Sequence, residues 1–193
     1  MQSTKSTYQD VHHDLIKDCR KGNQKSQMQI YKLYYKAMFN TSFRITGNAT
    51  DAEDIMQESF IDAFQKLDQY LEDGSFGGWL KRIVINNSLD FVKKQKPQIE
   101  SIDHLTIVED ADFEETTNDE AYRLKDIREA MEMLKDEYRI ILSLYLFEGY
   151  DHEEISEILG ISYNLSRTRY SRAKNQLQEK ALTIQKERSM KWA

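Results

Sequence analysis

Residues 152 to 167 read HEEISEILGISYNLSR and contain two runs of helical periodicity separated by a glycine. Ile155 begins a set of apolar anchors spaced three and four residues apart, which is the spacing of one helix face. Gly160 permits the positive φ of a tight turn, and Ser162 can cap the helix that follows. A helix-turn-helix needs these features, because its first helix must hold its second at a fixed steep angle. The sequence therefore predicts a DNA-binding helix-turn-helix within residues 150 to 182.

The second helix of this motif, predicted over residues 163 to 183, would enter the major groove. Arginine can bond bidentately to guanine and asparagine to adenine, while other basic side chains reach phosphates. From residue 161 to residue 193 the chain has eight basic residues against two acidic ones. The alternative is a solvated basic face on a helix that only packs. The side chains expected to contact DNA are Tyr163, Asn164, Ser166, Arg167, Arg169, Arg172 and Lys174.

The rest of the chain also has helical character. One proline and seven glycines in 193 residues are too few for a sandwich or barrel of many short strands. A long helix is predicted to end at Gly47, and the next is predicted to begin with a capping box formed by Thr50 and Glu53. Further helices are expected over residues 77 to 95, 121 to 134, 136 to 147, 151 to 159 and 163 to 183. We therefore expect an all-α fold.

An acidic stretch divides the chain into two parts. Between residues 98 and 120 there are nine acidic residues and no Lys or Arg, and Pro97 comes just before them. We expect two small helical domains, over residues 10 to 97 and 121 to 185, joined by this acidic flexible linker. The linker acts either as a solubilising tether or as a mimic of nucleic acid that lies in a basic channel.

Several classes of function are disfavoured by the composition. The single cysteine, Cys19, cannot form an intramolecular disulfide. The N-terminal residues do not have the pattern of a signal peptide, and no apolar stretch is long enough to span a membrane, so we expect a cytoplasmic protein without membrane insertion. The four histidines do not fall at metal-ligand spacings, and no phosphate-binding glycine loop or nucleophile arrangement is present. We therefore expect no metal, no cofactor and no enzymatic activity.

Two segments together resemble a known family. Residues 47 to 60 read GNATDAEDIMQESF, and residues 154 to 162 read EISEILGIS. At this separation in a chain of this length they are similar to the extracytoplasmic-function (ECF) sigma factors of bacterial RNA polymerase. The resemblance implies a transcription initiation factor that binds core RNA polymerase, through the largest-subunit coiled coil and the flap region, and directs it to promoter DNA. It places Asp54, Gln57 and Glu58 at the contact with the coiled coil.

A third segment extends the resemblance. Residues 76 to 90, FGGWLKRIVINNSLD, look like the family segment that melts the promoter and reads its −10 element, whereas the helix-turn-helix corresponds to the part that reads the −35 element. The loop before this segment would hold a flipped base. The residues implied at this second DNA site are Asp73, Ser75, Phe76, Lys81, Arg82, Asn86, Asn87, Lys93 and Lys94.

The resemblance also leaves open points. Asn164, Leu165 and Ser166 stand where the family commonly has Gly-Thr-Val, so the upstream sequence that is recognised cannot be transferred from relatives. Family members are usually restrained by an anti-sigma factor, which is therefore an expected partner. The tail after Leu182 is too short for a further sensing domain. A stand-alone helix-turn-helix regulator remains the alternative, although it would need a dimer and would leave residues 47 to 60 unexplained.

Overall fold

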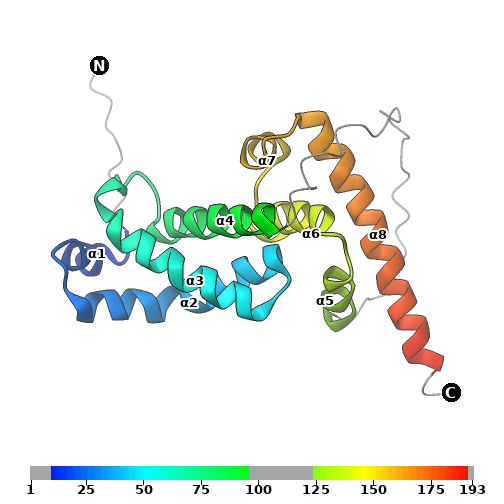
Figure 1. The fold of residues 1–193 in the computed structure, drawn as a ribbon, viewed down its shortest axis with the longest axis horizontal. Helices are drawn as coiled ribbons and strands as arrows, with labels where there is room; N and C mark the ends of the chain where they lie inside the picture. The colour runs from blue at the N-terminus through cyan, green and yellow to red at the C-terminus, as the bar shows by residue number, and fades with distance from the viewer. Residues whose placement is uncertain (1–9, 96–123, 191–193) are drawn as a thin grey trace. The chain divides into compact units, whose positions relative to one another are not determined.

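The computed structural model describes residues 10–95 and 124–190, and all its regular elements in these ranges are helices (Figure 1). The predicted all-α class is therefore confirmed. The chain forms two compact units that divide after Val92. The acidic linker predicted over residues 98 to 120 lies outside the described residues. Within the described ranges, no helix is both long enough and apolar enough to cross a membrane.

Over its described residues, the N-terminal unit contains four α-helices and one short 3-10 helix. Their bounds are α1 His13–Arg20, α2 Gln24–Thr46, α3 Ala49–Gln65, η1 Leu67–Gln69 and α4 Phe76–Gln95. The buried faces of α2, α3 and α4 meet in a core that includes Ile30, Phe60 and Leu80. Cys19 on α1 belongs to this core, and burial together with the nearby Asp18 carboxylate raises the pKa of its thiol to about 11. The thiol is thus a buried apolar group.

The turn between α2 and α3 confirms the predicted end of α2 and contradicts the predicted cap of α3. Gly47 ends α2 with φ of 73°, as the sequence indicates. The cap of α3, however, is Asn48, whose side-chain oxygen accepts hydrogen bonds from the amides of Thr50 at 2.9 Å and Asp51 at 3.2 Å. Because the helix begins at Ala49, Thr50 already lies in its first turn. The predicted capping box of Thr50 and Glu53 therefore does not form.

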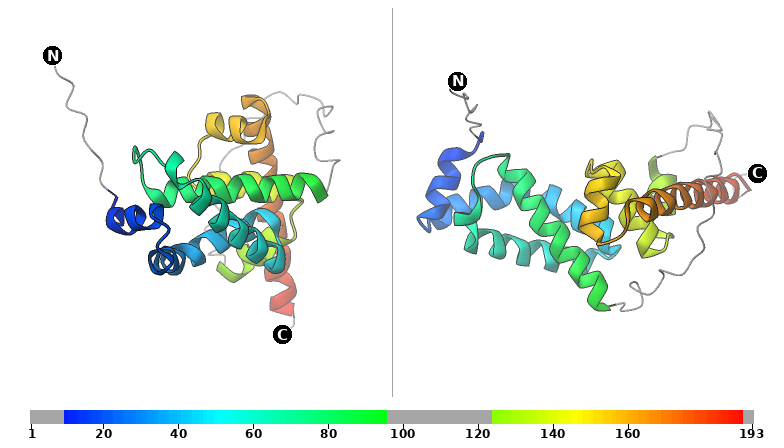
Figure 2. Two further views of the ribbon diagram at one scale, coloured as in Figure 1. Left: turned by 60° about the vertical axis from the view of Figure 1, so that its left-hand side comes forward. Right: turned by 90° about the horizontal axis from the view of Figure 1, so that it is seen from above.

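The C-terminal unit consists of helices that pack against one long helix (Figure 2). Their bounds are α5 Leu124–Glu132, α6 Asp136–Leu142, a π-helical turn over Ser143–Phe147, α7 His152–Leu159 and α8 Tyr163–Met190. The end of α8 lies seven residues beyond the predicted residue 183. This extension is stabilised by α5, because Ala181 and Ile184 pack on Ala130, and Arg188 forms ion pairs with carboxylates of α5.

Candidate functional site

The turn between α7 and α8 has the geometry of a helix-turn-helix. Asp151 caps α7, accepting hydrogen bonds from the amides of Glu153 and Glu154, each at 2.9 Å, and the Glu154 carboxylate accepts one in return from the Asp151 amide at 2.9 Å. Gly160 ends α7 with φ of 67°. The Ser162 hydroxyl then accepts a hydrogen bond from the amide of Leu165 at 3.2 Å. The predicted turn glycine and the predicted cap of α8 are both confirmed.

Ser166 is the first predicted DNA contact that the structure contradicts. Its side chain is fully buried, and its hydroxyl oxygen lies 3.1 Å from Nδ1 of His152 on α7. It therefore connects the two helices of the motif and does not face the major groove of DNA. The buried hydroxyl is satisfied because a polar partner, His152, stands opposite it.

His152 itself lies in a cluster of aromatic rings. Its ring stacks on Tyr145 with centroids 4.8 Å apart, and it meets Tyr170 edge to face at 5.3 Å and Tyr163 at 6.3 Å. Burial in this cluster, followed by the positive charge of Arg167, lowers the pKa of His152, and the smaller effect of Asp151 opposes them. The cluster joins the π-helical turn, α7 and the start of α8 into one packed group.

Arg169 is the second correction on α8. Its side chain is only 13% exposed, and its Nε lies 3.9 Å from a carboxylate oxygen of Glu137 on α6. The prediction failed because residues two positions apart on a helix point in different directions, so Arg167 and Arg169 cannot both face DNA. Arg167 is exposed, and its guanidinium lies 6.0 Å from the ring centroid of Tyr163.

The outward face of α8 therefore lacks two of the side chains that were predicted to contact DNA. It also includes two residues that were not predicted. Tyr163, Asn164 and Lys174 are exposed beside Arg167, and Arg172 is half-buried. Ser171, which is half-buried, and Asn175, which is exposed, follow Arg167 at intervals of four residues and share its face, although neither was predicted to contact DNA. Helical spacing measured from Arg167 alone would have identified them.

On α3, the three residues predicted for polymerase binding lie on one exposed strip. Asp54, Gln57 and Glu58 are all exposed, at the spacing of one helix face. The Gln57 side-chain amide donates a hydrogen bond to Glu53 at 3.4 Å. Ile61, which is 57% exposed and was not predicted as a site residue, completes the strip. The signal in the sequence is an apolar residue one helical turn after two polar residues, on the same helix face.

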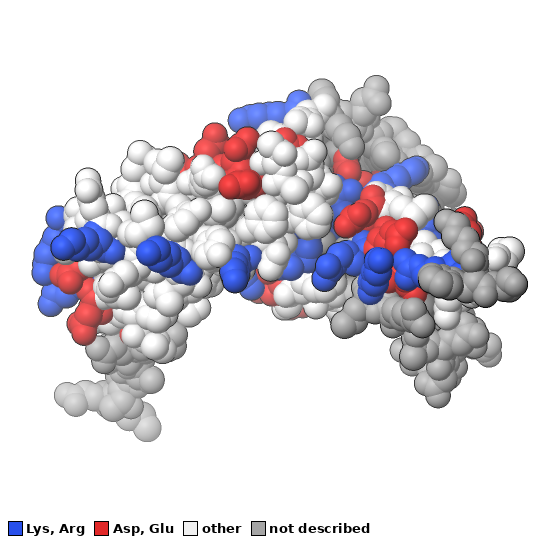
Figure 3. Space-filling model, turned by 90° about the horizontal axis from the view of Figure 1, so that it is seen from below, with Lys and Arg blue, Asp and Glu red and all other residues white. Residues whose placement is uncertain are grey.

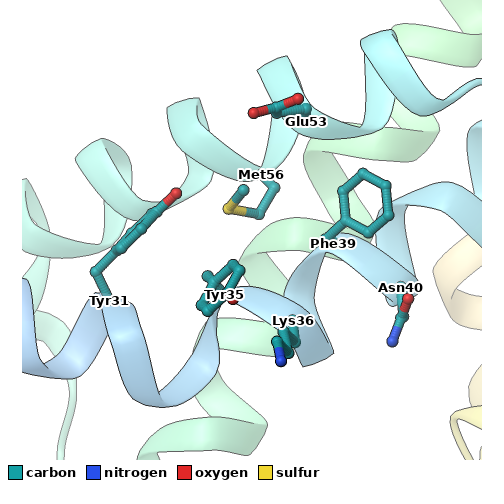
Figure 4. Close-up of a pocket in the computed structure, with 7 residues that line it drawn as sticks. All are labelled: Tyr31, Tyr35, Lys36, Phe39, Asn40, Glu53 and Met56. Atoms are coloured by element: carbon teal, nitrogen blue, oxygen red, sulfur yellow. The ribbon is translucent and has the colours of Figure 1, made fainter.

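A groove runs beside this strip, between α2 and α3, and has a volume of about 370 Å³ (Figure 4). Tyr31, Tyr35 and Phe39 from α2 form one wall, and Met56 from α3 faces them. The remaining lining residues are Lys36, Asn40 and Glu53.

The two helices that border the groove carry opposite charge. α2 has four basic residues and no acidic one, whereas α3 has five acidic residues and no basic one. Figure 3 looks onto one face of the molecule and shows a row of Lys and Arg side chains across its left-hand part, with Asp and Glu side chains above the row and also below its left end. Such a surface is complementary to a protein partner with both signs of charge and disfavours a nucleic acid, whose charge is of one sign only.

The predicted second DNA site lies on α4 and the loop before it. Arg82, Asn86, Lys93 and Lys94 are exposed on α4, and Lys81 is half-buried. In the loop, Asp73 and Ser75 are exposed, and the Ser75 hydroxyl accepts a hydrogen bond from the Gly78 amide at 3.1 Å, which caps α4.

Two of the predicted residues in this region are engaged within the protein. Phe76 is 1% exposed and packs in the core against Tyr70 and Trp79, so it cannot hold an extruded base. Asn87 is half-buried, and its amide donates hydrogen bonds to the Ser59 hydroxyl at 3.1 Å and to Asp62 at 3.2 Å, both on α3. Both residues lie on the face of α4 that the neighbouring helices cover, which local sequence does not reveal.

Comparison with protein families and relatives covers both units. Residues 30–98 match the family model described as sigma-70 region 2, and residues 124–177 match sigma-70, region 4. The chain is 30% identical over 174 residues to the ECF RNA polymerase sigma factor SigW of Bacillus subtilis, covering 85% of this chain and 93% of the relative. It is 32% identical over 135 residues to the RNA polymerase sigma factor SigV of the same organism, covering 70% and 78%.

A solved structure has a similar fold. The sigma factor RpoE from Bartonella quintana, crystallised in complex with the anti-sigma factor NepR, aligns with a TM-score of 0.55 and 24% identity. The alignment covers 81% of this chain and 96% of that one.

Proposed function

Because this chain belongs to the ECF sigma factors of the sigma-70 family, we propose that it binds core RNA polymerase, directs it to specific promoters and helps to melt promoter DNA. The two units divide this work. The N-terminal unit would bind the polymerase and act at the −10 element, and the C-terminal unit would read the −35 element. Catalysis of RNA synthesis would remain with the polymerase, so we expect no enzymatic activity in this chain, and we expect it to act in the cytoplasm.

The observation that carries this proposal is the exposed strip on α3. Asp54, Gln57 and Glu58 lie on the face of α3 opposite the core of the unit, so all three are available to a partner. Ile61 adds exposed apolar area to the same strip. A strip of polar groups around an apolar residue is typical of a protein-binding surface. We propose the largest-subunit coiled coil of core polymerase as its partner, and the flap region as the partner of the C-terminal unit.

The groove between α2 and α3 would enlarge this surface. It borders the strip directly, since Glu53 lines the groove and accepts the hydrogen bond from Gln57. An anti-sigma factor is the other partner that we propose here, because the sigma factor from Bartonella quintana is bound to one. A protein that covers the strip and the groove would block polymerase binding by occupying the same residues.

On the C-terminal unit, we propose that Asn164 and Arg167 contact bases of the DNA. We propose that Tyr163, Arg172 and Lys174 lie along the sugar-phosphate backbone of the DNA. Ser171 and Asn175 extend the same face. On the N-terminal unit, Asp73 and Ser75 would lie against the flipped base. The side chains proposed to follow the non-template strand are Lys81, Arg82, Asn86, Lys93 and Lys94.

A binding experiment tests the proposal. The double variant Gln57→Ala, Glu58→Ala is expected to bind purified core polymerase at least about tenfold more weakly, as expected for the loss of surface contacts worth more than about 1.4 kcal/mol. The matched control is Asp68→Ala, Gln69→Ala, which removes an exposed carboxylate and an exposed amide from η1 of the same unit. Equal affinity of the two double variants would refute the assigned role of α3. A stable dimer that binds a palindrome without polymerase would instead favour a stand-alone regulator.

A further inference from the structure

A leucine in the loop between η1 and α4 is exposed to solvent. Leu71 is 78% exposed, and it lies two residues before Asp73, at the start of the loop proposed to hold a flipped base. Single exposed leucines are common on protein surfaces and need no explanation by themselves. The position of Leu71 becomes informative because the loop that carries it is held rigidly from both sides.

Contacts with α1 hold the backbone on either side of Leu71. The Arg20 guanidinium donates hydrogen bonds to the Tyr70 carbonyl at 2.6 Å and to the Glu72 carboxylate at 2.5 Å. His13 Nδ1 lies 3.1 Å from the other carboxylate oxygen of Glu72. Glu72 adopts φ of 59°, in the left-handed region that a residue other than glycine occupies only when its surroundings demand it. The residues before and after Leu71 are therefore both fixed, which directs its side chain outward.

A second set of contacts fixes the loop and the start of α4. The Tyr70 hydroxyl donates a hydrogen bond to the Gly74 carbonyl at 2.6 Å, closing the loop on itself. The Asp10 carboxylate, 7% exposed, accepts a hydrogen bond from the Phe76 amide at 2.7 Å. The rings of Tyr70, Phe76 and Trp79 pack on one another with centroids 5.5 to 5.7 Å apart. Leu71 thus projects from a loop whose conformation is fixed by hydrogen bonds and by packed aromatic rings.

We propose that Leu71 is the wedge that separates the first base step when the promoter opens. The inference rests on the proposed function, in which this loop and α4 act at the −10 element. Proteins that kink duplex DNA insert apolar side chains such as leucine between base steps, and the wedge unstacks the bases it enters. A wedge must be exposed, apolar and held by a stiff support, and Leu71 has all three properties.

The neighbouring charges suit this role. The basic residues of α4 begin at Lys81, shortly after the loop, and they would neutralise the phosphates of the strand that is pulled aside. An unstacked base needs a place to go, and Asp73 and Ser75 follow Leu71 in the same loop. Leu71 would act only while bases are still stacked, so its contribution ends once the strands are apart.

Promoter opening by the holoenzyme tests this inference. The promoter would be one identified by mapping transcript starts, labelled with 2-aminopurine at the opening site, and used both as a full duplex and as a pre-opened template with mismatched bases. Leu71→Ala should reduce the open fraction or opening rate on the duplex by about tenfold, because part of the unstacking free energy is no longer supplied. On the pre-opened template the same variant should match the wild type.

Two further variants make the test specific. Leu71→Ile keeps an apolar side chain of the same size and should restore most of the opening on the duplex. Leu33→Ala removes another exposed leucine, 52% exposed on α2, and should leave opening unchanged. Normal opening of the duplex by Leu71→Ala would overturn the inference, and so would an equal loss on both templates, since that pattern means weakened binding. If the wild-type protein opens no duplex promoter with core polymerase, the proposed function itself is wrong.

Discussion

Nδ1 of His152 lies 3.1 Å from the hydroxyl oxygen of Ser166, which joins the first helix of the helix-turn-helix to the buried face of the second. Ser166 is fully buried, so its hydroxyl depends on partners within the protein. The stacked ring of Tyr145 holds the imidazole in place from the other side. The orientation of α8, and therefore of every side chain that it presents to DNA, is set in part by this pair.

Replacing the serine should weaken the C-terminal unit. Ser166→Ala removes one hydrogen bond from a buried site and should lower the free energy of unfolding by about 1 kcal/mol. Urea unfolding of the full chain, followed by circular dichroism, measures this change. Ser171→Ala, a serine on the outward face of the same helix, should change stability by less than about 0.5 kcal/mol. Equal effects of the two substitutions would argue against a stabilising role for the His152 contact.

The pair should also make stability depend on pH. Burial and Arg167 lower the pKa of His152 below its usual 6.5, so the unfolded chain binds a proton before the folded one as the pH falls. The resulting stabilisation is complete above the unfolded pKa and is lost as the pH falls through the folded pKa. His152→Phe keeps a stacking ring but cannot titrate. Subtracting its unfolding free energies from those of the wild type, measured between about pH 8 and pH 5 across the reference pKa of histidine, should leave a difference that falls with acidity. A flat difference would contradict the assignment.

Local sequence was sufficient to locate the turns after α2 and α7, but not the cap of α3, the end of α8 or the buried faces of the helices. Gly47, Gly160 and Ser162 act on their own neighbours in the chain, so the turn chemistry could be predicted from the residues. Whether a side chain on α8 points to water or to another helix depends on packing between distant residues. Arg169 looks like any basic residue of a recognition helix until Glu137, which lies 32 positions earlier, is found beside it.

The two arginines of α8 should therefore behave differently. Arg167→Ala should weaken binding to the upstream promoter element by about 1 to 3 kcal/mol, the worth of a good contact to a base, and leave stability nearly unchanged. Arg169→Ala should lower the free energy of unfolding by about 1 to 3 kcal/mol, because it leaves the Glu137 carboxylate without its partner. Holoenzyme binding to promoter DNA and urea unfolding separate the two effects. A destabilised Arg167→Ala variant would refute this division.

Neighbouring asparagines on α4 offer a similar matched pair. Asn87→Ala removes two hydrogen bonds to α3 and should destabilise the N-terminal unit by about 1 to 2 kcal/mol. Asn86→Ala changes an exposed side chain and should affect promoter opening without affecting stability. Thermal unfolding and 2-aminopurine fluorescence report the two quantities. If both variants lose stability equally, the hydrogen bonds of Asn87 to Ser59 and Asp62 are not what holds α4 on α3.

The start of α3 gives a last comparison of neighbours. Asn48 and Thr50 lie two positions apart and both have side chains that can cap a helix, so the sequence alone does not decide which of them caps α3. Asn48→Ala should cost about 1 kcal/mol, because the amides of Thr50 and Asp51 lose their acceptor. Thr50→Ala lies within the first turn and should cost less than about 0.5 kcal/mol. A larger loss for Thr50→Ala in urea unfolding would restore the capping box that the sequence suggested.

Run-off transcription with purified core RNA polymerase is the most direct test of the central claim, that this chain is the promoter-specificity subunit. Templates drawn from a genomic library would be transcribed with core polymerase alone, with the wild-type protein added, and with the Gln57→Ala, Glu58→Ala variant added. The account predicts discrete transcripts that require the wild-type protein and are lost or strongly reduced with the variant. The absence of any transcript that depends on the wild-type protein would contradict it.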